Sequence, residues 1–237
     1  NDGSIVCNEE DCPIGGECEN GFTYFELEDI PNSTIILDGS QCFSNIDLNI
    51  LNDIIVDNNL DLNPIALGTQ NWFNGHLTRL TIGNFYDGGN VTLTTLPNSI
   101  GDLPNIAILY LNYNDLVSLP DSITNLTNLI YLVLSFNSLT HLPENIGNLS
   151  NMIWLDLGYN NLESIPESIG NFSMIEYLWI FNNNLSELPE SICNLNLDWD
   201  GLDLNFLPYF GSGGNMLCQN LPECVENSDN INTSIDP

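Results

Sequence analysis

The sequence contains no lysine and a single arginine, Arg79, against 32 acidic residues, and its formal net charge is −31. Proteins that bind nucleic acids or anionic membrane surfaces need clustered lysine and arginine side chains to displace counterions. The composition therefore excludes both classes of partner. Cations or cationic partners are the natural counterparts of such a chain. The alternative is that the acidity only maintains solubility, with repulsion screened by salt over about 8 Å.

Histidine is also scarce, because only His76 and His141 are present. Without lysine, and with one arginine, the chain has few side chains that act as general bases or bind phosphates and oxyanions. Paired carboxylates remain the one catalytic alternative, since Asp156, Glu176 and Asp203 lie on or beside one predicted surface. We expect no catalytic residues and no enzymatic activity.

Long apolar runs are missing as well, and none approaches the roughly 20 residues that a membrane-spanning helix needs. The chain begins at Asn1 without a methionine or a charged leader, so we expect that a signal peptide has been removed. Hydrophobic residues still make up 43% of the sequence, which is enough to bury a continuous core.

No cysteine lies in the middle of the chain. The seven cysteines fall near the two ends, at Cys7, Cys12, Cys18, Cys42, Cys193, Cys218 and Cys224. This distribution is typical of disulfide-tied caps in an extracellular protein, and no Cys-x-x-Cys pair indicates zinc. We predict two bridges among the first four cysteines, in one of three pairings, and a bridge from Cys193 to Cys218 or Cys224. The odd count leaves a thiol that is free or bonded to another chain.

A repeat of 23 residues occupies the middle of the sequence. Its copies begin at Ile106, Leu129, Met152 and Ile175, and their ninth positions are Asn114, Asn137, Asn160 and Asn183. Leucine or isoleucine at the fourth and sixth positions predicts a short strand in each copy, with these side chains in the core. Stacked copies then form a parallel sheet. We expect the asparagine amides to point inward and to satisfy backbone groups at a turn.

The pattern L-x-x-L-x-L-x-x-N-x-L-x-x-L-P-x-x-I-x-x-L resembles the leucine-rich-repeat family, in its extracellular form with cysteine-containing caps. An earlier copy begins at Leu77 and carries an insertion of about six residues, Tyr86 to Val91. A degenerate last copy is predicted at Trp199, Leu202 and Leu204. The resemblance implies an α/β solenoid, a leucine-rich-repeat horseshoe with a parallel sheet on its concave face. Residues 72–80 resemble the junction between an N-terminal cap and the first repeat.

This organisation divides the chain into four parts. Residues 1–76 form an N-terminal cap, in which Ile46, Ile50, Leu51, Ile54 and Ile55 predict an amphipathic helix over 44–59. About six repeats follow over 77–207, then a C-terminal cap over 208–224 and a polar tail or linker over 225–237.

The outward positions of each copy are the third, fifth, seventh and eighth, and aromatic residues are concentrated there. The candidate ligand-binding residues on this concave face are Tyr110, Tyr113, Tyr131, Phe136, Trp154, Asp156, Tyr159, Tyr177, Trp179, Phe181 and Asp203. Large aromatic patches mark surfaces where partners bind. The alternative is that the rings follow strand propensity and stack on one another without a ligand.

We therefore expect a secreted or cell-surface recognition module that binds a protein or glycan ligand through this face. The alternative is an extracellular structural subunit that forms a surface layer, matrix or filament, in which the same face contacts further copies of the chain. The odd cysteine would serve attachment in that case, although repulsion between such acidic chains opposes assembly unless cations bridge them.

Two weaker motifs concern ions and glycans. Asp57, Asn59, Asp61 and Asn63 alternate like the start of a calcium loop, but Leu62 and Gly68 replace its glycine and its closing glutamate. Calcium is therefore the only cofactor that we consider, against the alternative of a solvated loop. Candidate N-glycosylation sites are Asn32, Asn90, Asn125, Asn148, Asn171, Asn184 and Asn232. Three of these recur at the repeat period and are equally explained by the repeat consensus.

Overall fold

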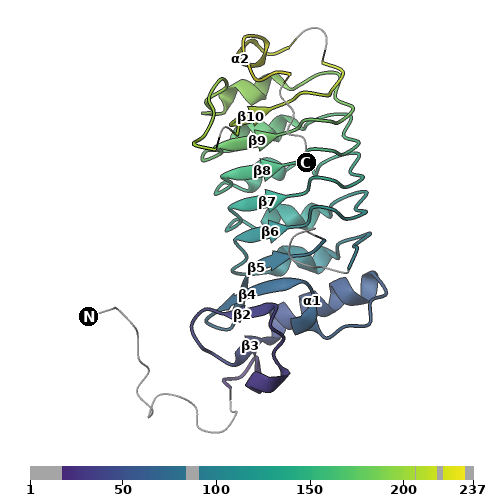
Figure 1. Cartoon of the computed structure of the whole chain (residues 1–237), viewed down its shortest axis with the longest axis vertical. Coiled ribbons are helices and arrows are strands. Elements are labelled where there is room, and N and C mark those ends of the chain that lie inside the picture. Colours follow the sequence, from purple (N-terminus) through teal and green to yellow (C-terminus); the bar gives the residue numbers. More distant parts are fainter. Residues whose placement is uncertain (1–17, 84–90, 206, 218–220, 233–237) are drawn as a thin grey trace, which may run out of the picture.

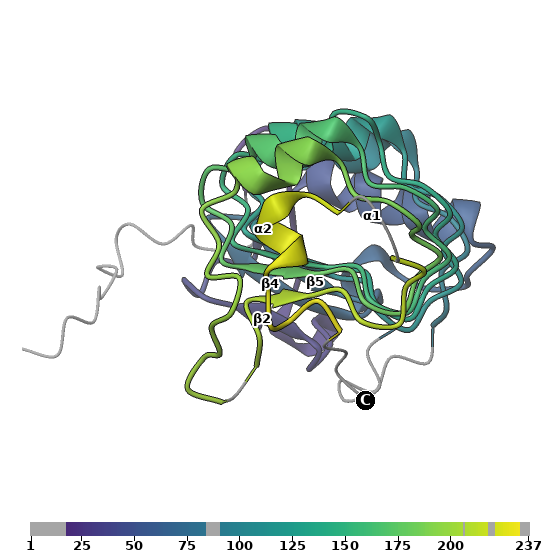
Figure 2. The same cartoon turned by 90° about the horizontal axis from the view of Figure 1, so that it is seen from above.

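The computed structural model describes residues 18–83, 91–205, 207–217 and 221–232. They form an elongated stack of similar coils, each with a short strand on one side (Figure 1). Seen along the stack, the strands lie on one side and short 3-10 helices lie on the opposite side, with the core between them (Figure 2). The described helices include none that is long and apolar enough to cross a membrane.

The main sheet has eight strands in the order β10-β9-β8-β7-β6-β5-β4-β2, and β1 pairs with β3 in a separate ribbon. Neighbours from β5 to β10 are parallel, while β4 is antiparallel to β5. The strands are β1 Phe22–Tyr24, β2 Thr34–Ile36, β3 Cys42–Ser44, β4 Thr69–Phe73, β5 His76–Thr81, β6 Ile108–Tyr110, β7 Tyr131–Val133, β8 Trp154–Asp156, β9 Tyr177–Trp179 and β10 Phe210–Gly211.

The predicted solenoid is confirmed. Strand pairing aligns the fourth-position leucines Leu109, Leu132, Leu155 and Leu178, and all four are fully buried. The 3-10 helices are η1 Leu27–Asp29, η2 Pro64–Ala66, η3 Asn98–Asp102, η4 Asp121–Asn125, η5 Ile146–Asn148, η6 Glu167–Asn171 and η7 Glu190–Asn194. Helices η3 to η7 form the second halves of the repeats. Four of them begin directly after the repeated proline, whose fixed φ suits that place, and η5 begins three residues after Pro143.

The inward asparagine ladder is also confirmed. In Asn160, the side-chain amide donates to the carbonyls of Leu134 and Leu157, each at 3.0 Å, and the side-chain oxygen accepts from the N–H of Leu139. Asn114, Asn137 and Asn183 repeat this arrangement. Each side chain therefore links its own coil to the preceding one and satisfies buried backbone groups.

At the N-terminal end, helix α1 (Asn45–Asp57) covers the core with Ile50, Leu51, Ile54 and Ile55. Ile46 faces solvent, in contrast to its predicted place in the apolar stripe. Buried Asp47 on α1 accepts from the N–H of Leu77 at 2.7 Å and contacts His76 at 3.3 Å, so His76 has a structural role. The junction at 72–80 is a hairpin of β4 and β5, whose turn residues Asn74 and Gly75 both have positive φ.

The predicted last copy at Trp199, Leu202 and Leu204 is wrong. Phe210 pairs with Leu178, 32 residues away rather than 23, so nine extra residues, 198–206, separate the two coils. Leu204 is 99% exposed, whereas Phe210 is fully buried at the core position. Asn215 extends the ladder by donating to the carbonyls of Ile180 and Ser212. The nine-residue insertion breaks the period, which is why the sequence pattern fails here.

The C-terminal end is closed by the short helix α2 (Glu223–Glu226), which places Val225 in the core. Residues 225–232 differ from the expected linker, because Ser228 and Asn230 are buried and both donate hydrogen bonds to the carbonyl of Trp199. This segment packs on the last coils rather than leaving them.

The caps are tied by disulfides, as expected, between Cys18 and Cys42 and between Cys193 and Cys224. The second bridge selects one of the two predicted partners of Cys193. Cys7, Cys12 and Cys218 lie outside the described residues, so their state stays a prediction.

Candidate functional site: an aromatic row on the sheet

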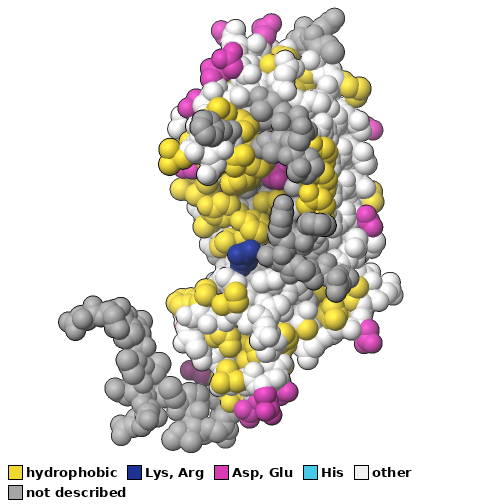
Figure 3. Space-filling view, in the orientation of Figure 1, with side chains coloured by type: hydrophobic (Ala, Val, Ile, Leu, Met, Phe, Trp, Pro, Cys, Tyr) yellow, Lys and Arg dark blue, Asp and Glu magenta, His cyan; other side chains and the backbone are white. Residues whose placement is uncertain are grey.

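Aromatic rings at the third position of successive coils form a row across the sheet. The register places Tyr131 beside Trp154 and Trp154 beside Tyr177, and β10 places Tyr209 next. Neighbouring ring centroids are 6.4, 4.5 and 5.0 Å apart. We call these four residues the aromatic row. Hydrophobic side chains gather over these strands in the space-filling view (Figure 3).

All four rings of the aromatic row are half-buried, so each keeps an outward surface. The Tyr177 hydroxyl donates to Asp203 Oδ2 at 3.2 Å. Burial, followed by this hydrogen bond, raises the pKa of Tyr177 to about 12, which keeps the phenol protonated as a donor. The indole N–H of Trp154 is buried without a hydrogen-bond partner among the described residues.

The fifth position is less uniform, and two predicted surface residues there prove to be buried. Trp179 is 7% exposed, because it packs edge-to-face on Trp154 at 4.6 Å and donates its indole N–H to the carbonyl of Pro208 at 2.7 Å. Asp156 is 6% exposed. Tyr110 is half-buried, with the Arg79 guanidinium 5.0 Å from its ring centroid. The deep positions of Trp179 and Asp156 correct the expectation that both face solvent.

Asp156 is therefore a carboxyl group buried beneath the outward face of the sheet. It accepts from the N–H of Gly158 at 3.0 Å and shares a hydrogen bond with the Ser135 side chain. Burial raises the pKa of Asp156 from 3.8 to about 6, and these two hydrogen bonds offset the rise only in part. The group consequently titrates within the range of mildly acidic fluids.

A second set of rings follows the ends of the strands. The centroids of Tyr113 and Phe136 are 4.4 Å apart, those of Phe136 and Tyr159 are 4.2 Å apart, and both pairs are stacked within 12°. Phe181 closes the set edge-to-face on Tyr159 at 5.7 Å. We call these four residues the edge stack.

The geometry of the edge stack depends on a repeated turn. Tyr113, Phe136 and Tyr159 have φ between 53 and 58°, a left-handed conformation that is rare for bulky residues. Their backbone N–H groups still bond to the next coil, which holds the turn in place. Phe181 is 3% exposed and fills the space beside Gly158, where an added Cβ would lie 2.3 Å from its ring. The predicted exposure of Phe181 is therefore wrong.

The insertion 198–206 projects from the sheet side of the stack, as the pale green loop at the lower left of Figure 2 shows. We call it the finger; its residue Phe206 lies outside the described set. Asp203 Oδ1 accepts from the N–H groups of Asn205 and Leu207, at 2.7 and 2.9 Å. Asp203 Oδ2 accepts from Tyr177. The predicted site residue Asp203 thus reaches the aromatic row from the finger and not from a strand.

Tyr209 is the member of the aromatic row that sequence reasoning missed. It occupies the third position of the last coil, after the nine-residue insertion that shifts the register. The available signal was the spacing of Phe210, Ser212 and Asn215, which matches the fourth, sixth and ninth positions of a repeat.

Comparison with known proteins identifies the repeats. The family described as leucine rich repeat matches residues 127–185. Among solved structures, the leucine-rich-repeat ectodomain of the receptor kinase SOBIR1 from Arabidopsis thaliana is 26% identical, with a TM-score of 0.56 over 76% of this chain and 96% of that one. The chain therefore contains leucine-rich repeats. A search of curated proteins gives no match.

Two further solved structures have longer chains. A protein from Leptospira interrogans is 30% identical over 65% of this chain, with a TM-score of 0.48. A plant ice-binding protein is 22% identical over 79% of this chain, with a TM-score of 0.58, and shows the fold alone. This chain spans 41% and 61% of the lengths of these two proteins.

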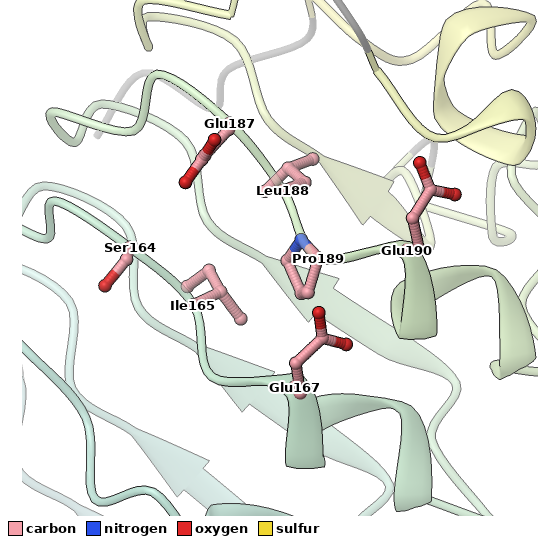
Figure 4. Close-up of a pocket in the computed structure, with 7 residues that line it drawn as sticks. All are labelled: Ser164, Ile165, Glu167, Glu187, Leu188, Pro189 and Glu190. Carbon is pink, nitrogen blue, oxygen red and sulfur yellow. The ribbon is translucent and has the colours of Figure 1, made fainter.

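A separate pocket of about 330 Å³ lies between neighbouring repeats (Figure 4), and no residue of the aromatic row lines it. It is lined by Ser164, Ile165, Glu167, Glu187, Leu188, Pro189 and Glu190. Its three glutamates come from consecutive repeats, and within the described parts of the chain no group of three or more His, Cys, Asp or Glu residues is arranged to hold a metal ion. The pocket therefore adds nothing to the candidate site.

The other predicted positions lie outside the aromatic row and the edge stack. In the calcium candidate, Asp57 ends α1, Asn59 has a φ of 54° and Asn63 caps η2 through Ile65 N–H; calcium binding stays a prediction. Sequon asparagines are exposed at Asn32, Asn125, Asn148, Asn171, Asn184 and Asn232, and Asn90 lies outside the described residues. Glycosylation of any of them stays a prediction.

Proposed function

We propose that this chain is an extracellular recognition module whose aromatic row binds an extended segment of a partner protein. The observation that carries the proposal is the unbroken contact of half-buried rings from Tyr131 to Tyr209, at outward positions of four neighbouring strands. Aromatic residues are enriched where proteins dock, because they offer large contact areas at a small entropic cost. Two disulfides support a place in an oxidising compartment outside the cell.

The ring geometry favours a polypeptide over a glycan. Trp154 lies between Tyr131 and Tyr177, at centroid distances of 6.4 and 4.5 Å, so neighbouring rings cover much of its two faces. Ring edges carry partial positive charge and attract carbonyl oxygens, which an extended chain offers at every residue. A carbonyl would also satisfy the indole N–H of Trp154 if the ring turned toward it.

The dimensions of the sheet suit a short segment. Six parallel strands at about 4.8 Å span about 24 Å, which an extended peptide covers with about seven residues. The SOBIR1 ectodomain, a structural neighbour, belongs to a receptor kinase and supports a receptor-like role for this fold. We propose binding rather than catalysis, since the two histidines take part in Asp47–His76 and Thr140–His141 contacts away from the row.

A display selection tests this function. A library of linear dodecapeptides would be selected on the intact, disulfide-bonded chain at physiological salt, and the affinities of enriched peptides would be measured with variants. We expect Trp154→Ala and Tyr131→Ala each to weaken binding by about 2 kcal/mol, or about thirtyfold, as for central rings of an interface. Val117→Ala, an exposed apolar residue outside the row, is the matched control and should leave affinity unchanged.

Circular dichroism of each variant would establish that the solenoid is intact. Peptides that bind both aromatic variants as tightly as the wild type would refute the proposal. Self-association through the same face is the competing function, and light scattering with and without calcium separates it: chains that associate only when the rings are present would favour assembly.

A further inference from the structure

Resting on the proposed function, we propose that the segment bound by the aromatic row is cationic, with a lysine or arginine side chain seated between Asp203 and the rings of Tyr177 and Tyr209. The finger and the charge distribution around the row carry this inference. A neutral or acidic segment is an outcome of the test below.

The finger holds a carboxylate at one end of the aromatic row. Hydrogen bonds from the backbone N–H groups of Leu207 and then Asn205, followed by the Tyr177 hydroxyl, lower the pKa of Asp203, so this group is ionised at neutral pH. Oδ2 accepts one bond from Tyr177, and a carboxylate oxygen has a second lone pair that an ammonium or guanidinium donor can use.

The position of Asp203 is fixed before any ligand binds. Trp179 holds the base of the finger through Pro208 at 2.7 Å, and the Asp203 backbone N–H donates to the carbonyl of Leu207 at 2.8 Å. A preorganised acceptor loses little conformational entropy on binding. The rings of Tyr177 and Tyr209 are tilted by 43° and do not stack, so a cation that reaches Asp203 would also contact their faces.

Further negative charge lies close to the same end. Glu176 is exposed directly before Tyr177, and its charge contributes to the raised pKa of that phenol. Asp156 adds a charge beneath the row once its carboxyl group ionises. A cation at Asp203 would therefore be attracted by several groups, whereas an acidic side chain would be repelled.

The only arginine in the sequence shows how rings on this face receive a cation. The Arg79 guanidinium lies 5.0 Å from the Tyr110 ring centroid, within the range of a cation–π contact. Because the sequence has no lysine and no second arginine, a further lysine or arginine side chain over the face must come from a partner. With a formal net charge of −31, the chain also steers cationic segments toward itself over long range.

The dodecapeptide selection tests the inference through the composition of the enriched peptides. We expect them to carry net positive charge with apolar residues interspersed. An acidic protein can attract cationic peptides without a specific site, so enrichment counts only for peptides that Trp154→Ala or Tyr131→Ala releases. A control peptide of the same sequence, with glutamine in place of each lysine and arginine, should lose most of the affinity. We call it the glutamine peptide.

Asp203→Asn provides the local test, because asparagine keeps the acceptor oxygen that orders the finger and removes the charge. We expect it to weaken binding of the cationic peptide about fourfold, the scale of an exposed charge pair. Glu144→Gln, which removes the same charge on the side of the 3-10 helices, should change affinity less than about twofold. The wild type and Asp203→Asn should bind the glutamine peptide with the same affinity.

Three results would overturn the inference. Ring-dependent peptides that are neutral or acidic would leave the proposed function standing and refute the cationic ligand. Equal losses from Asp203→Asn and Glu144→Gln would show that attraction is general rather than seated at the finger. Cationic peptides that bind both aromatic variants unchanged would refute both proposals.

Discussion

Asp156 occupies a repeat position that is predicted to face solvent, but its side chain is buried in the structure. Its strand residue points out of the sheet, yet Trp179 and the neighbouring coils leave it 6% exposed. In the folded state its pKa is about 6, whereas the unfolded chain has the ordinary value of 3.8. The folded state therefore binds this proton more tightly than the unfolded state does.

This linkage predicts a pH-dependent loss of stability. The contribution of Asp156 to the free energy of unfolding is most favourable below pH 4. It decreases as the pH rises from about 4 to 6, and it does not change further at higher pH. Two pKa units correspond to a loss of about 3 kcal/mol. We expect Asp156→Asn to exceed the wild type in free energy of unfolding by up to that amount at pH 7. The two proteins should be alike near pH 4.

Urea denaturation across this pH range would measure the difference. Asp121→Asn, at an exposed carboxylate on η4, controls for the general relief of repulsion between acidic groups. A stability difference between Asp156→Asn and the wild type that is the same at pH 4 and pH 7 would contradict the account.

At the scale of elements, the finger depends on one carboxylate for its internal order. Asp203→Ala removes the acceptor for Asn205, Leu207 and Tyr177, so we expect exchange of the Asn205 and Leu207 amide protons to accelerate at least about tenfold. Leu204→Ala, at the exposed tip, is the matched control and should change neither rate. Hydrogen exchange read by NMR provides the measurement, and unaltered rates in Asp203→Ala would show that other contacts order the finger.

The elements also show where sequence reasoning succeeds and where it stops. Asn137 and Leu132 recur with the period, so their inward positions follow from spacing alone. The finger breaks that spacing, and Trp199, Leu202 and Leu204 imitate a repeat because leucine alternates with polar residues in a hairpin as it does in a strand. A repeat pattern predicts which face of the sheet a residue occupies, but it does not predict whether neighbouring side chains cover that residue.

The burial of outward residues illustrates this limit. The repeat pattern predicts that Trp179 and Phe181 face solvent. The side chain of Trp179 does lie on the outward face of the sheet, but both residues are buried. Their burial results from packing on Trp154, Pro208 and Gly158, which belong to neighbouring coils. Such packing depends on side-chain sizes across coils and cannot be derived from a single copy.

At the scale of the whole molecule, a solenoid exposes its core at both ends and needs caps that stay in place. The Cys193–Cys224 bridge links η7 to α2, which inserts Val225 into the core. We expect a Cys193→Ser, Cys224→Ser double variant to lose about 2 to 5 kcal/mol of stability. Because coils contact only their neighbours, the loss should appear as faster amide exchange in the last coils, with β6 and β7 little changed.

Exchange that accelerates equally in all coils would contradict local capping by this disulfide. Non-reducing peptide mapping of the wild-type chain is the accompanying control, because a free thiol at Cys193 would remove the basis of the prediction.

The central claim is that the aromatic row is the surface that meets the partner. Its most direct test is a photo-crosslinking peptide, chosen from the display selection, with a benzophenone at its central residue and mass spectrometry to locate each crosslink. We expect crosslinks to strands β6 to β10 or to the finger, and their loss in excess unlabelled peptide. Competed crosslinks that fall instead on the 3-10 helices η3 to η7, on the opposite side of the solenoid, would contradict it.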